Sequence, residues 1–253
     1  MIAELPAPEK IDEDALAEAL RDGSLDLVCV LGPTASGKTR YAVSLARRLG
    51  AEIISADSRQ VYRGMDIGTG KDLSEYGDVP FHLIDIQPAG AKYNVYEYQK
   101  DFVKVYQDVR RRGRVPLLCG GTGLYIEAAT CGYDFDRRYP TVDPALLPHN
   151  TFYIGTLVDR ATRNARIDTR LDARLAEGLV DEVRGLLDAG VPAETLIYYG
   201  LEYKFVTQHV LGILSYDEMR TLLGNAIHQF AKRQMTWFRG MERDGIVIHW
   251  TEV

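Results

Sequence analysis

Short apolar runs alternate with amphipathic stretches along the first part of the chain. Short runs that end at glycine or a polar residue are typical of strands buried inside a parallel sheet. Residues 39–50 and 94–113 instead carry apolar positions at helical spacing, and Asn94 and Glu97 have the spacing of a capping box. Strands that alternate with helices predict an α/β fold with helices on both faces of a parallel sheet. The predicted strands are 26–32, 51–57, 79–86, 114–121 and 151–158.

The last third of the chain is predicted to be mainly helical, from residue 159 to about 243. Ser215 and Glu218 have the spacing of a second capping box and predict a helix start. The apolar run at 246–250 predicts an edge strand. Because no internal repeat or low-complexity linker interrupts the chain, we expect a single domain over residues 1–253 with a helical C-terminal part.

Composition indicates an ordinary globular protein. Apolar residues make up 46% of the 253 residues and charged residues 26%, with a net charge of −6. This charge does not predict general nucleic-acid binding, but it leaves room for a local basic patch. The three cysteines have no paired spacing, so neither a disulfide framework nor a zinc site is indicated. No apolar run has membrane-spanning length and the N-terminus is acidic, so we expect a cytoplasmic protein without a membrane partner.

The sequence GPTASGKT at residues 32–39 fits the phosphate-loop pattern G-x-x-x-x-G-K-[ST]. In such a loop backbone N–H groups surround an anion, the lysine adds positive charge, and the last hydroxyl binds Mg²⁺. A plain glycine turn is the alternative, but the predicted strand before the loop and helix after it favour the phosphate loop. The expected ligand-binding residues are Gly32, Thr34, Ala35, Ser36, Gly37, Lys38 and Thr39, with Thr39 as the metal ligand.

A second motif, SADSRQVYRGMDIGTGKD, runs from Ser55 to Asp72. Asp57 closes a predicted strand that we expect beside the phosphate-loop strand, where open α/β sheets bind ligands. A carboxylate there can bind metal through water or accept a proton, although a lone aspartate can also cap the next helix. Asp85, after another predicted strand, could be a second metal-associated carboxylate or a loop cap.

Five motifs in order resemble those of the tRNA dimethylallyltransferases, also called tRNA isopentenyltransferases. They are GPTASGKT, ADSRQVYRGMDIGTGK, HLIDI, GGTGLYI and AKRQMTWFR. The resemblance implies a P-loop three-layer sandwich and transfer of a dimethylallyl group from dimethylallyl diphosphate to the N6 amine of an adenine, most often in the tRNA anticodon loop. It also implies that the phosphate loop holds the diphosphate with Mg²⁺ and not a nucleoside triphosphate.

The resemblance assigns roles to individual residues. Asp57 matches the general base, and Thr39 would bind Mg²⁺. Hydroxyls that line the site match Thr34 and Thr122, while Ser58 and Gln60 match contacts to the acceptor nucleotide.

An arginine-rich stretch supplies candidates for the diphosphate. The family's R-I-x-x-R phrase aligns with Arg166 and Arg170, and we favour Arg166 as the catalytic arginine. The alternative is a solvated helix face on which the arginines pair with Asp168 and Asp172.

The AKRQMTWFR motif is expected to contact RNA. Lys232, Arg233 and Gln234 are the candidate substrate-binding residues, since basic residues interleaved with an aromatic suit backbone contact and base stacking. Trp237 and Phe238 are nevertheless expected in the core, as aromatic residues at helical spacing usually are.

The acceptor stays open at this stage. Longer bacterial relatives carry a helical insertion that grips the anticodon stem-loop, whereas here a short irregular segment at 127–156 occupies that interval. A free adenine nucleotide, as in adenylate isopentenyltransferases, is therefore an alternative acceptor, although SRQVYRG and AKRQMTWFR resemble the tRNA branch more. A nucleoside or nucleotide kinase is a third reading, because phosphate loop, arginines and sheet are shared. We expect a monomer.

Overall fold

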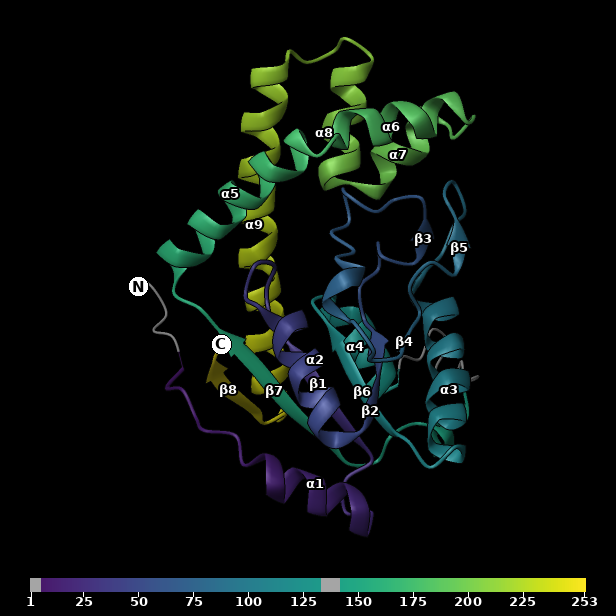
Figure 1. Ribbon diagram of the computed structural model, residues 1–253, viewed down its shortest axis with the longest axis vertical. Helices are drawn as coiled ribbons and strands as arrows, with labels where there is room; N and C mark the ends of the chain where they lie inside the picture. Colours follow the sequence, from purple (N-terminus) through teal and green to yellow (C-terminus); the bar gives the residue numbers. More distant parts are fainter. Residues whose placement is uncertain (1–5, 133–141) are drawn as a thin grey trace.

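The protein is described by a computed structural model over residues 6–132 and 142–253 (Figure 1). Its centre is a six-stranded sheet in the order β4-β2-β6-β1-β7-β8, and every neighbouring pair is parallel. The predicted α/β fold with a parallel sheet is confirmed. The strands are β1 (Leu27–Leu31), β2 (Ala51–Ser55), β4 (Phe81–His82), β6 (Val115–Gly120), β7 (Thr151–Leu157) and β8 (Ile248–Glu252).

The predicted strand at 79–86 is much shorter in the structure. Only Phe81–His82 pair with β2, and Leu83 and Asp85 then adopt positive φ angles of 62° and 57° that turn the chain out of the sheet. The run at 246–250 does form the predicted edge strand, β8, which pairs with β7. Local apolar pattern thus identified where strands begin better than where they end.

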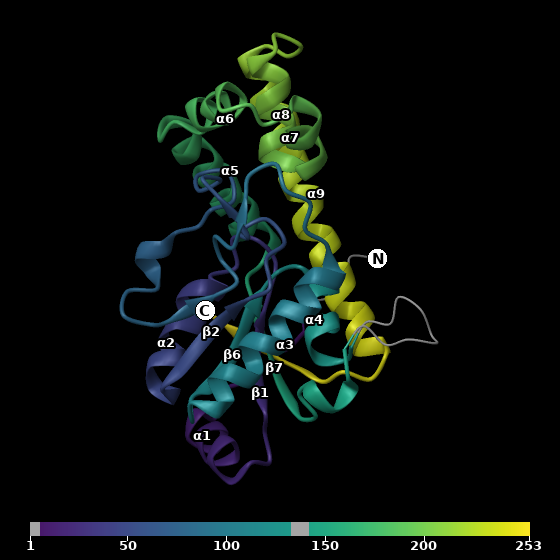
Figure 2. The same ribbon diagram turned by 90° about the vertical axis from the view of Figure 1, so that its right-hand side faces the viewer.

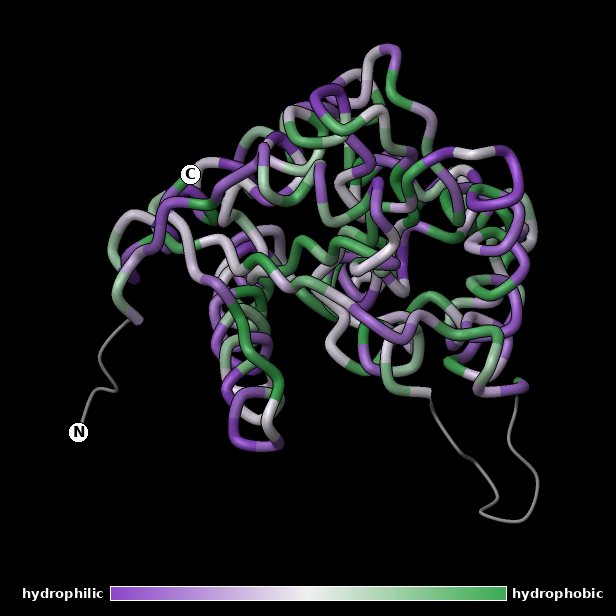
Figure 3. Tube along the Cα trace, turned by 90° about the horizontal axis from the view of Figure 1, so that it is seen from below, coloured by the Kyte–Doolittle hydropathy of each residue, from purple (hydrophilic) through white to green (hydrophobic). Residues whose placement is uncertain are grey.

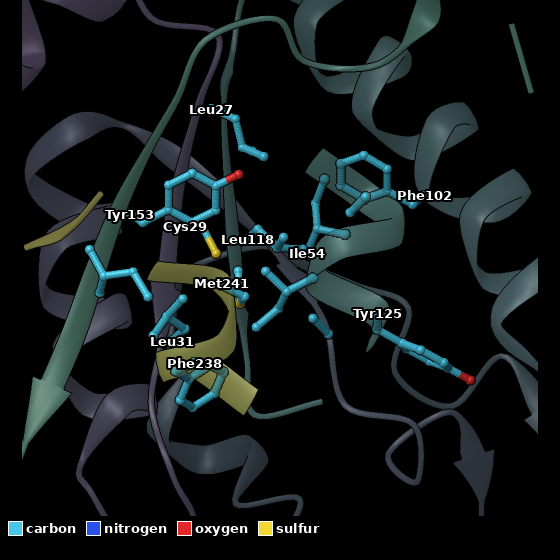
Figure 4. Packing of buried hydrophobic residues seen from close by; sticks show 14 of the residues in the cluster. Leu27, Cys29, Leu31, Ile54, Phe102, Leu118, Tyr125, Tyr153, Phe238 and Met241 are labelled. Atoms are coloured by element: carbon cyan, nitrogen blue, oxygen red, sulfur yellow. The ribbon is translucent and has the colours of Figure 1, made fainter. Parts of the chain in front are cut away.

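Helices cover both faces of the sheet (Figure 2). The helices α1 (Glu13–Asp22) and α2 (Lys38–Leu49) pack on one face through Leu16, Val43 and Leu45. On the other face lie α3 (Val95–Arg111), α4 (Gly123–Thr130) and the end of α9 (Tyr216–Arg243). Figure 4 shows this second core, in which alternate β1 residues meet aromatic and aliphatic side chains from these helices. Seen from below, apolar stretches run through the middle of the molecule and hydrophilic stretches lie mostly outside (Figure 3).

Both predicted capping boxes are present. The Asn94 side chain caps α3 together with Glu97, and the Ser215 side chain caps α9 together with Glu218. In each case the cap satisfies N–H groups that the first helical turn leaves without partners.

A helical part stands above the carboxyl edge of the sheet (Figure 1). It contains α5 (Arg160–Ala176), α6 (Leu179–Asp188), α7 (Ala193–Tyr199), α8 (Leu201–Val210) and the first half of α9. Their apolar residues pack around Val61, Tyr62 and Met65, which belong to the loop after β2. Because α9 continues from this part down onto the sheet, the two halves of the structure share one helix. Two short strands, β3 (Tyr62–Arg63) and β5 (Gln87–Pro88), form a separate parallel pair.

The interval at 127–156 is irregular only in its middle. Residues 127–130 complete α4, and 151–156 belong to β7. Between them lies one 3₁₀ turn at Pro144–Leu146, and residues 133–141 fall outside the described part of the chain. Across the described residues no helix is long and apolar enough to cross a membrane.

Candidate functional site

The loop between β1 and α2 has the backbone of an anion-binding nest. Ala35 and Gly37 have positive φ angles of 61° and 86°, and no side chain caps the N-terminus of α2. The uncapped N–H groups and the positive end of the helix dipole therefore face the loop interior. Gly32 is required beneath this nest, because a Cβ there would collide with the hydroxyls of Thr156 and Ser36.

Lys38 brings the main positive charge of the loop. Its side chain is half-buried, and within the described part of the chain its Nζ has no hydrogen-bond or ion-pair partner. Burial lowers the pKa of Lys38, and the nearby Arg170 and Arg59 lower it further while Asp57 opposes them. A partly desolvated cation held near other cations is stabilised by an anion, so this lysine is suited to bind one.

Ser36 supports the loop instead of reaching the ligand. Its hydroxyl is buried 2.6 Å from the Thr156 hydroxyl, and its N–H donates to the Pro33 carbonyl at 3.3 Å. The Ser36 hydroxyl is thus used inside the protein, and the assignment of Ser36 to the ligand site stays a prediction.

Asp57 lies just past the end of β2 on the same edge of the sheet. The strand order places β6 between β2 and the phosphate-loop strand β1, so the two are next-but-one neighbours and not adjacent. The Asp57 Oδ1 accepts a hydrogen bond of 2.9 Å from the Arg59 N–H, which fixes the carboxylate. Thr122, at the N-cap position of α4, accepts a 3.2 Å hydrogen bond from the Ser58 N–H. The bond between Ser58 and Thr122 joins the loop that carries Asp57 to the GGTG turn at 120–123.

One cavity brings seven of the predicted residues together. Thr34, Lys38, Thr39, Asp57, Gln60, Arg170 and Gln234 line it. Arg59, Arg174, Glu202 and Phe230 line it as well and were not predicted as site residues. The sequence held a signal for Arg59, which stands between two predicted residues of one motif, but none for Glu202, which comes from the remote helix α8.

The arginine at the cavity is not the one favoured from the sequence. Arg166 is exposed and lines a shallow depression on the outside of α5, whereas Arg170 and Arg174 line the cavity. Arg166 lies four residues before Arg170, about 6 Å away along the helix axis. Arg170, which was predicted to bind substrate, and Arg174 thus reach the cavity from the same helix, whereas Arg166 does not line it.

Gln234 is buried, and its carboxamide is used by the protein. Its Oε1 accepts from the Thr34 N–H at 2.8 Å, and its Nε2 donates to the Gly121 carbonyl at 2.9 Å. It therefore ties the phosphate loop to the GGTG turn, although it also lines the cavity. Lys232 and Arg233 on the same helix are exposed and do not line the cavity.

The two aromatic residues of the last helix differ in burial. Phe238 is fully buried, as expected, but Trp237 is 42% exposed. The indole of Trp237 packs against Gly123, and its Nε1 donates to Glu127 Oε2 at 3.0 Å. The prediction of a core tryptophan is therefore wrong, because α9 packs on α4 along this face and leaves one side of the ring open.

Asp85 is not a second carboxylate of the site. It pairs with the buried Lys71, which also contacts Asp66 and the Tyr62 carbonyl. Since β4 is the edge strand, Asp85 lies far along the strand order from β1. Among the described residues, no three His, Cys, Asp or Glu side chains gather as a metal cluster.

Comparisons with known proteins point to one family. The family described as IPP transferase matches residues 60–147 and 136–241, and the family described as isopentenyl transferase matches 25–76. A tRNA dimethylallyltransferase 1 of Porphyromonas gingivalis is 48% identical over 89% of this chain and 93% of its own length. One from Parabacteroides distasonis is 48% identical over 90% and 93%. The crystal structure of the tRNA isopentenylpyrophosphate transferase from Bacillus halodurans has a TM-score of 0.79 at 31% identity and covers 89% of both chains.

Proposed function

The chain belongs to the IPP transferase family, the tRNA dimethylallyltransferases, and we infer that it transfers a dimethylallyl group to the N6 amine of an adenine in tRNA. The family indicates adenine 37 of the anticodon loop as the acceptor and dimethylallyl diphosphate as the donor. One observation carries the inference. The phosphate-loop Lys38, which has no ion-pair partner among residues 6–132 and 142–253, and the fixed carboxylate of Asp57 line the same cavity.

The phosphate loop is suited to the diphosphate of the donor. The N–H groups at the start of α2, the Lys38 ammonium and the guanidiniums of Arg170 and Arg174 supply positive charge around one cavity. When the allylic C–O bond breaks, negative charge develops on the leaving diphosphate. Preorganised donors stabilise such a developing charge because they need no reorientation during the reaction.

Asp57 is suited to activate the acceptor. An exocyclic amine of adenine is a weak nucleophile, since its lone pair is delocalised into the ring. As the new C–N bond forms and the C–O bond breaks, the amine must lose a proton, and the Asp57 carboxylate takes it. The Arg59 N–H occupies Oδ1, which holds the carboxylate in place for this transfer.

The oxygen donors fit Mg²⁺. The ion is usually held by one or two protein oxygens together with substrate phosphates. Thr39 offers a hydroxyl and Asp57 a carboxylate at the same cavity, which suits an ion that arrives with the diphosphate. When bound, Mg²⁺ would supply charge neutralisation for the leaving diphosphate.

The acceptor RNA would lie along α9 and α4. Lys232 and Arg233 are exposed there, and Arg233 stands 6.0 Å from the centroid of Phe230, a residue of the cavity wall. The exposed indole of Trp237 lies further along the same helix. Charged groups beside an open aromatic ring suit single-stranded RNA. A monomeric state and a cytoplasmic location stay predictions.

One observation keeps the free adenine nucleotide as a second candidate acceptor. The alignment with the Porphyromonas gingivalis enzyme runs over 282 positions, more than the 253 residues of this chain, so that relative carries residues that this chain lacks. The two family matches overlap at 136–147, which supports a position of the missing residues in the interval after α4. We propose that the lost residues form part of the insertion that binds tRNA in longer relatives.

One assay tests both candidates. The protein is incubated with Mg²⁺ and labelled dimethylallyl diphosphate and is offered unmodified tRNA or AMP. Label in tRNA at adenine 37 supports the proposal, and label in AMP alone supports the second candidate. A parallel incubation with labelled ATP and no prenyl donor tests the kinase reading, since phosphoryl transfer there would contradict prenyl transfer.

A further inference from the structure

Several arginines converge on the cavity at Gly70. A Cβ on Gly70 would overlap the guanidinium groups of both Arg170 and Arg174, and the residue has a positive φ of 63°. Arg170 Nη2 also contacts Asp72 Oδ2 at 2.9 Å. Burial, together with the neighbouring positive charge of Arg170, lowers the pKa of Arg174 to about 10. Two adjacent cations with little solvent need negative partners.

Glu202 supplies one such partner from the first turn of α8. Its side chain is 4% exposed. One carboxylate oxygen, Oε2, lies 2.6 Å from Arg59 Nη1, and the other, Oε1, lies 3.4 Å from Arg174 Nη1. The carboxylate therefore joins two arginines that come from separate segments, the Asp57 loop and α5.

Arg59 is held on a second side by an aromatic ring. Its guanidinium lies 5.4 Å from the centroid of Phe230, and its side chain is only 17% exposed. The charges of Glu202 and Asp57 raise the pKa of Arg59 against the effect of burial, so it stays a cation. Each guanidinium has five N–H donors, and Glu202 occupies a small part of them. In the described part of the chain no other side chain or carbonyl accepts a hydrogen bond from the Arg59 or Arg174 guanidinium, so the remaining donors can face an anion in the cavity.

We propose that Glu202 is a positioning residue: its carboxylate holds the guanidiniums of Arg59 and Arg174 so that their other donors bind the diphosphate group of the donor. The identity of the anion rests on the proposed function. The simpler alternative is an ion pair that only fixes α8 to the rest of the fold. The two readings differ in what happens to diphosphate affinity when the protein stays folded.

Glu202→Gln separates them because it changes little in shape. A carboxylate has two acceptor oxygens and serves both arginines, whereas a carboxamide has one acceptor and one donor group. The variant can therefore hold one arginine only. Loss of one charge-assisted contact is expected to raise the Kd for pyrophosphate roughly tenfold or more.

The test uses inorganic pyrophosphate with Mg²⁺ in calorimetric titrations, together with the KM for dimethylallyl diphosphate, the Kd for tRNA and the Tm. Glu202→Gln should raise the pyrophosphate Kd and the donor KM and leave the tRNA Kd within about twofold. Glu182→Gln is the matched control. Glu182 accepts hydrogen bonds from the N–H groups of Asp66 and Ile67 at 2.8 and 2.7 Å but contacts no arginine of the cavity. It should lower the Tm without raising the pyrophosphate Kd.

A double-mutant cycle tests whether Glu202 affects pyrophosphate binding through Arg59 and Arg174. In an Arg59→Ala/Arg174→Ala background, Glu202→Gln should weaken pyrophosphate binding no further, since the residues it positions are gone. A lower Tm with an unchanged pyrophosphate Kd would overturn the proposal, and so would an equal loss in that background. Should Glu202→Gln not fold, Glu202→Asp keeps both acceptor oxygens on a shorter chain and should give a smaller rise in Kd; no rise would count against positioning.

Failure of the proposed function is recognised separately. If the wild-type protein does not prenylate tRNA but its pyrophosphate affinity depends on Glu202, the positioning role stands and the reaction is wrong. If the wild-type protein prenylates tRNA but Glu202→Gln has the same pyrophosphate Kd as wild type, the proposed reaction stands and the positioning role is wrong. A wild-type protein that does not bind pyrophosphate would overturn both.

Discussion

The carboxamide of Gln234 accepts a hydrogen bond from the backbone N–H of Thr34 at 2.8 Å, across 200 residues of sequence. The same side chain donates to the Gly121 carbonyl at 2.9 Å, so one residue of α9 fixes two turns of the site. A glycine is required at position 121, because a Cβ there would collide with the Gln234 amide. The last helix therefore takes part in shaping the phosphate loop as well as in covering the sheet.

We expect Gln234→Leu to weaken both folding and donor binding. It leaves the Thr34 N–H and the Gly121 carbonyl without their partner, and each unsatisfied buried group costs about 1–3 kcal/mol. The Tm should fall and the Kd for dimethylallyl diphosphate should rise. Gln229→Leu, at an exposed position of the same helix, is the control and should change neither. A Gln234→Leu protein with wild-type donor affinity would show that the loop keeps its shape without this bond.

Lys38→Ala is expected to weaken donor binding strongly. The lysine has no ion-pair partner among the described residues and lines the cavity, so its charge is available to the diphosphate. Charge-assisted contacts of this kind contribute about 1.5–3 kcal/mol, which corresponds to a rise in Kd of roughly tenfold or more. Titration with dimethylallyl diphosphate measures the effect. Arg40→Ala, an exposed cation two residues further along α2, should leave the Kd unchanged, and equal losses in both variants would argue for a nonspecific field effect.

Acid should weaken the fold through Glu52. Hydrogen bonds from Arg112 and with His82 together outweigh the effect of burial and lower the pKa of Glu52 from 4.5 to about 2. A carboxyl whose pKa is depressed by folding adds stability above its unfolded pKa and loses that stability as the pH falls toward the folded value. The Tm difference between wild type and Glu52→Gln should thus be full above pH 4.5 and vanish near pH 2. A difference that stays constant over this range would remove ionisation of Glu52 as its cause.

Features that depend on a few neighbouring residues were predictable from the sequence. The phosphate loop, both capping boxes and five of the six predicted strands lie as expected, because each is encoded in a short contiguous pattern. The short β4 was not foreseen, since the turn at Leu83 and Asp85 depends on Lys71 and on packing that local pattern does not contain.

The unpredicted part of the site depends on how distant segments pack. Glu202 contacts Arg59 only because α8 packs over the loop after β2. The local sequence around Glu202, GLEYK at 200–204, contains no pattern that predicts this contact. Arg166 and Arg170 are equivalent in the sequence, and only the position of α5 over the cavity makes Arg170 and Arg174 the lining residues. The exposure of Trp237 was unpredictable for the same reason. Helical spacing identifies the face of a helix on which a ring lies, but it does not determine how much of that ring a neighbouring helix covers.

Asp57→Asn is expected to slow the chemical step far more than it weakens the binding of either substrate. The asparagine keeps an oxygen that can accept from the Arg59 N–H, but it cannot take the amine proton. Removal of a positioned general base usually lowers the rate by about 10²–10⁴-fold. Single-turnover transfer with prebound donor and tRNA measures this step alone, and binding titrations show whether the substrates still bind. Wild-type single-turnover rates would exclude Asp57 as the base.

Charge reversal of Lys232 and Arg233 should weaken tRNA binding and spare small ligands. Both side chains are exposed on α9 and lie outside the donor cavity, so Lys232→Glu/Arg233→Glu removes RNA contacts without touching the phosphate loop. If each contacts one phosphate, the slope of log K against log salt for tRNA should flatten by about 0.7–0.9 per contact. Lys104→Glu/Arg111→Glu, an exposed pair on α3, corrects for the change in net charge. A drop in tRNA affinity that equals the control, or an equal loss of AMP affinity, would show that this face of α9 does not bind the anticodon stem-loop.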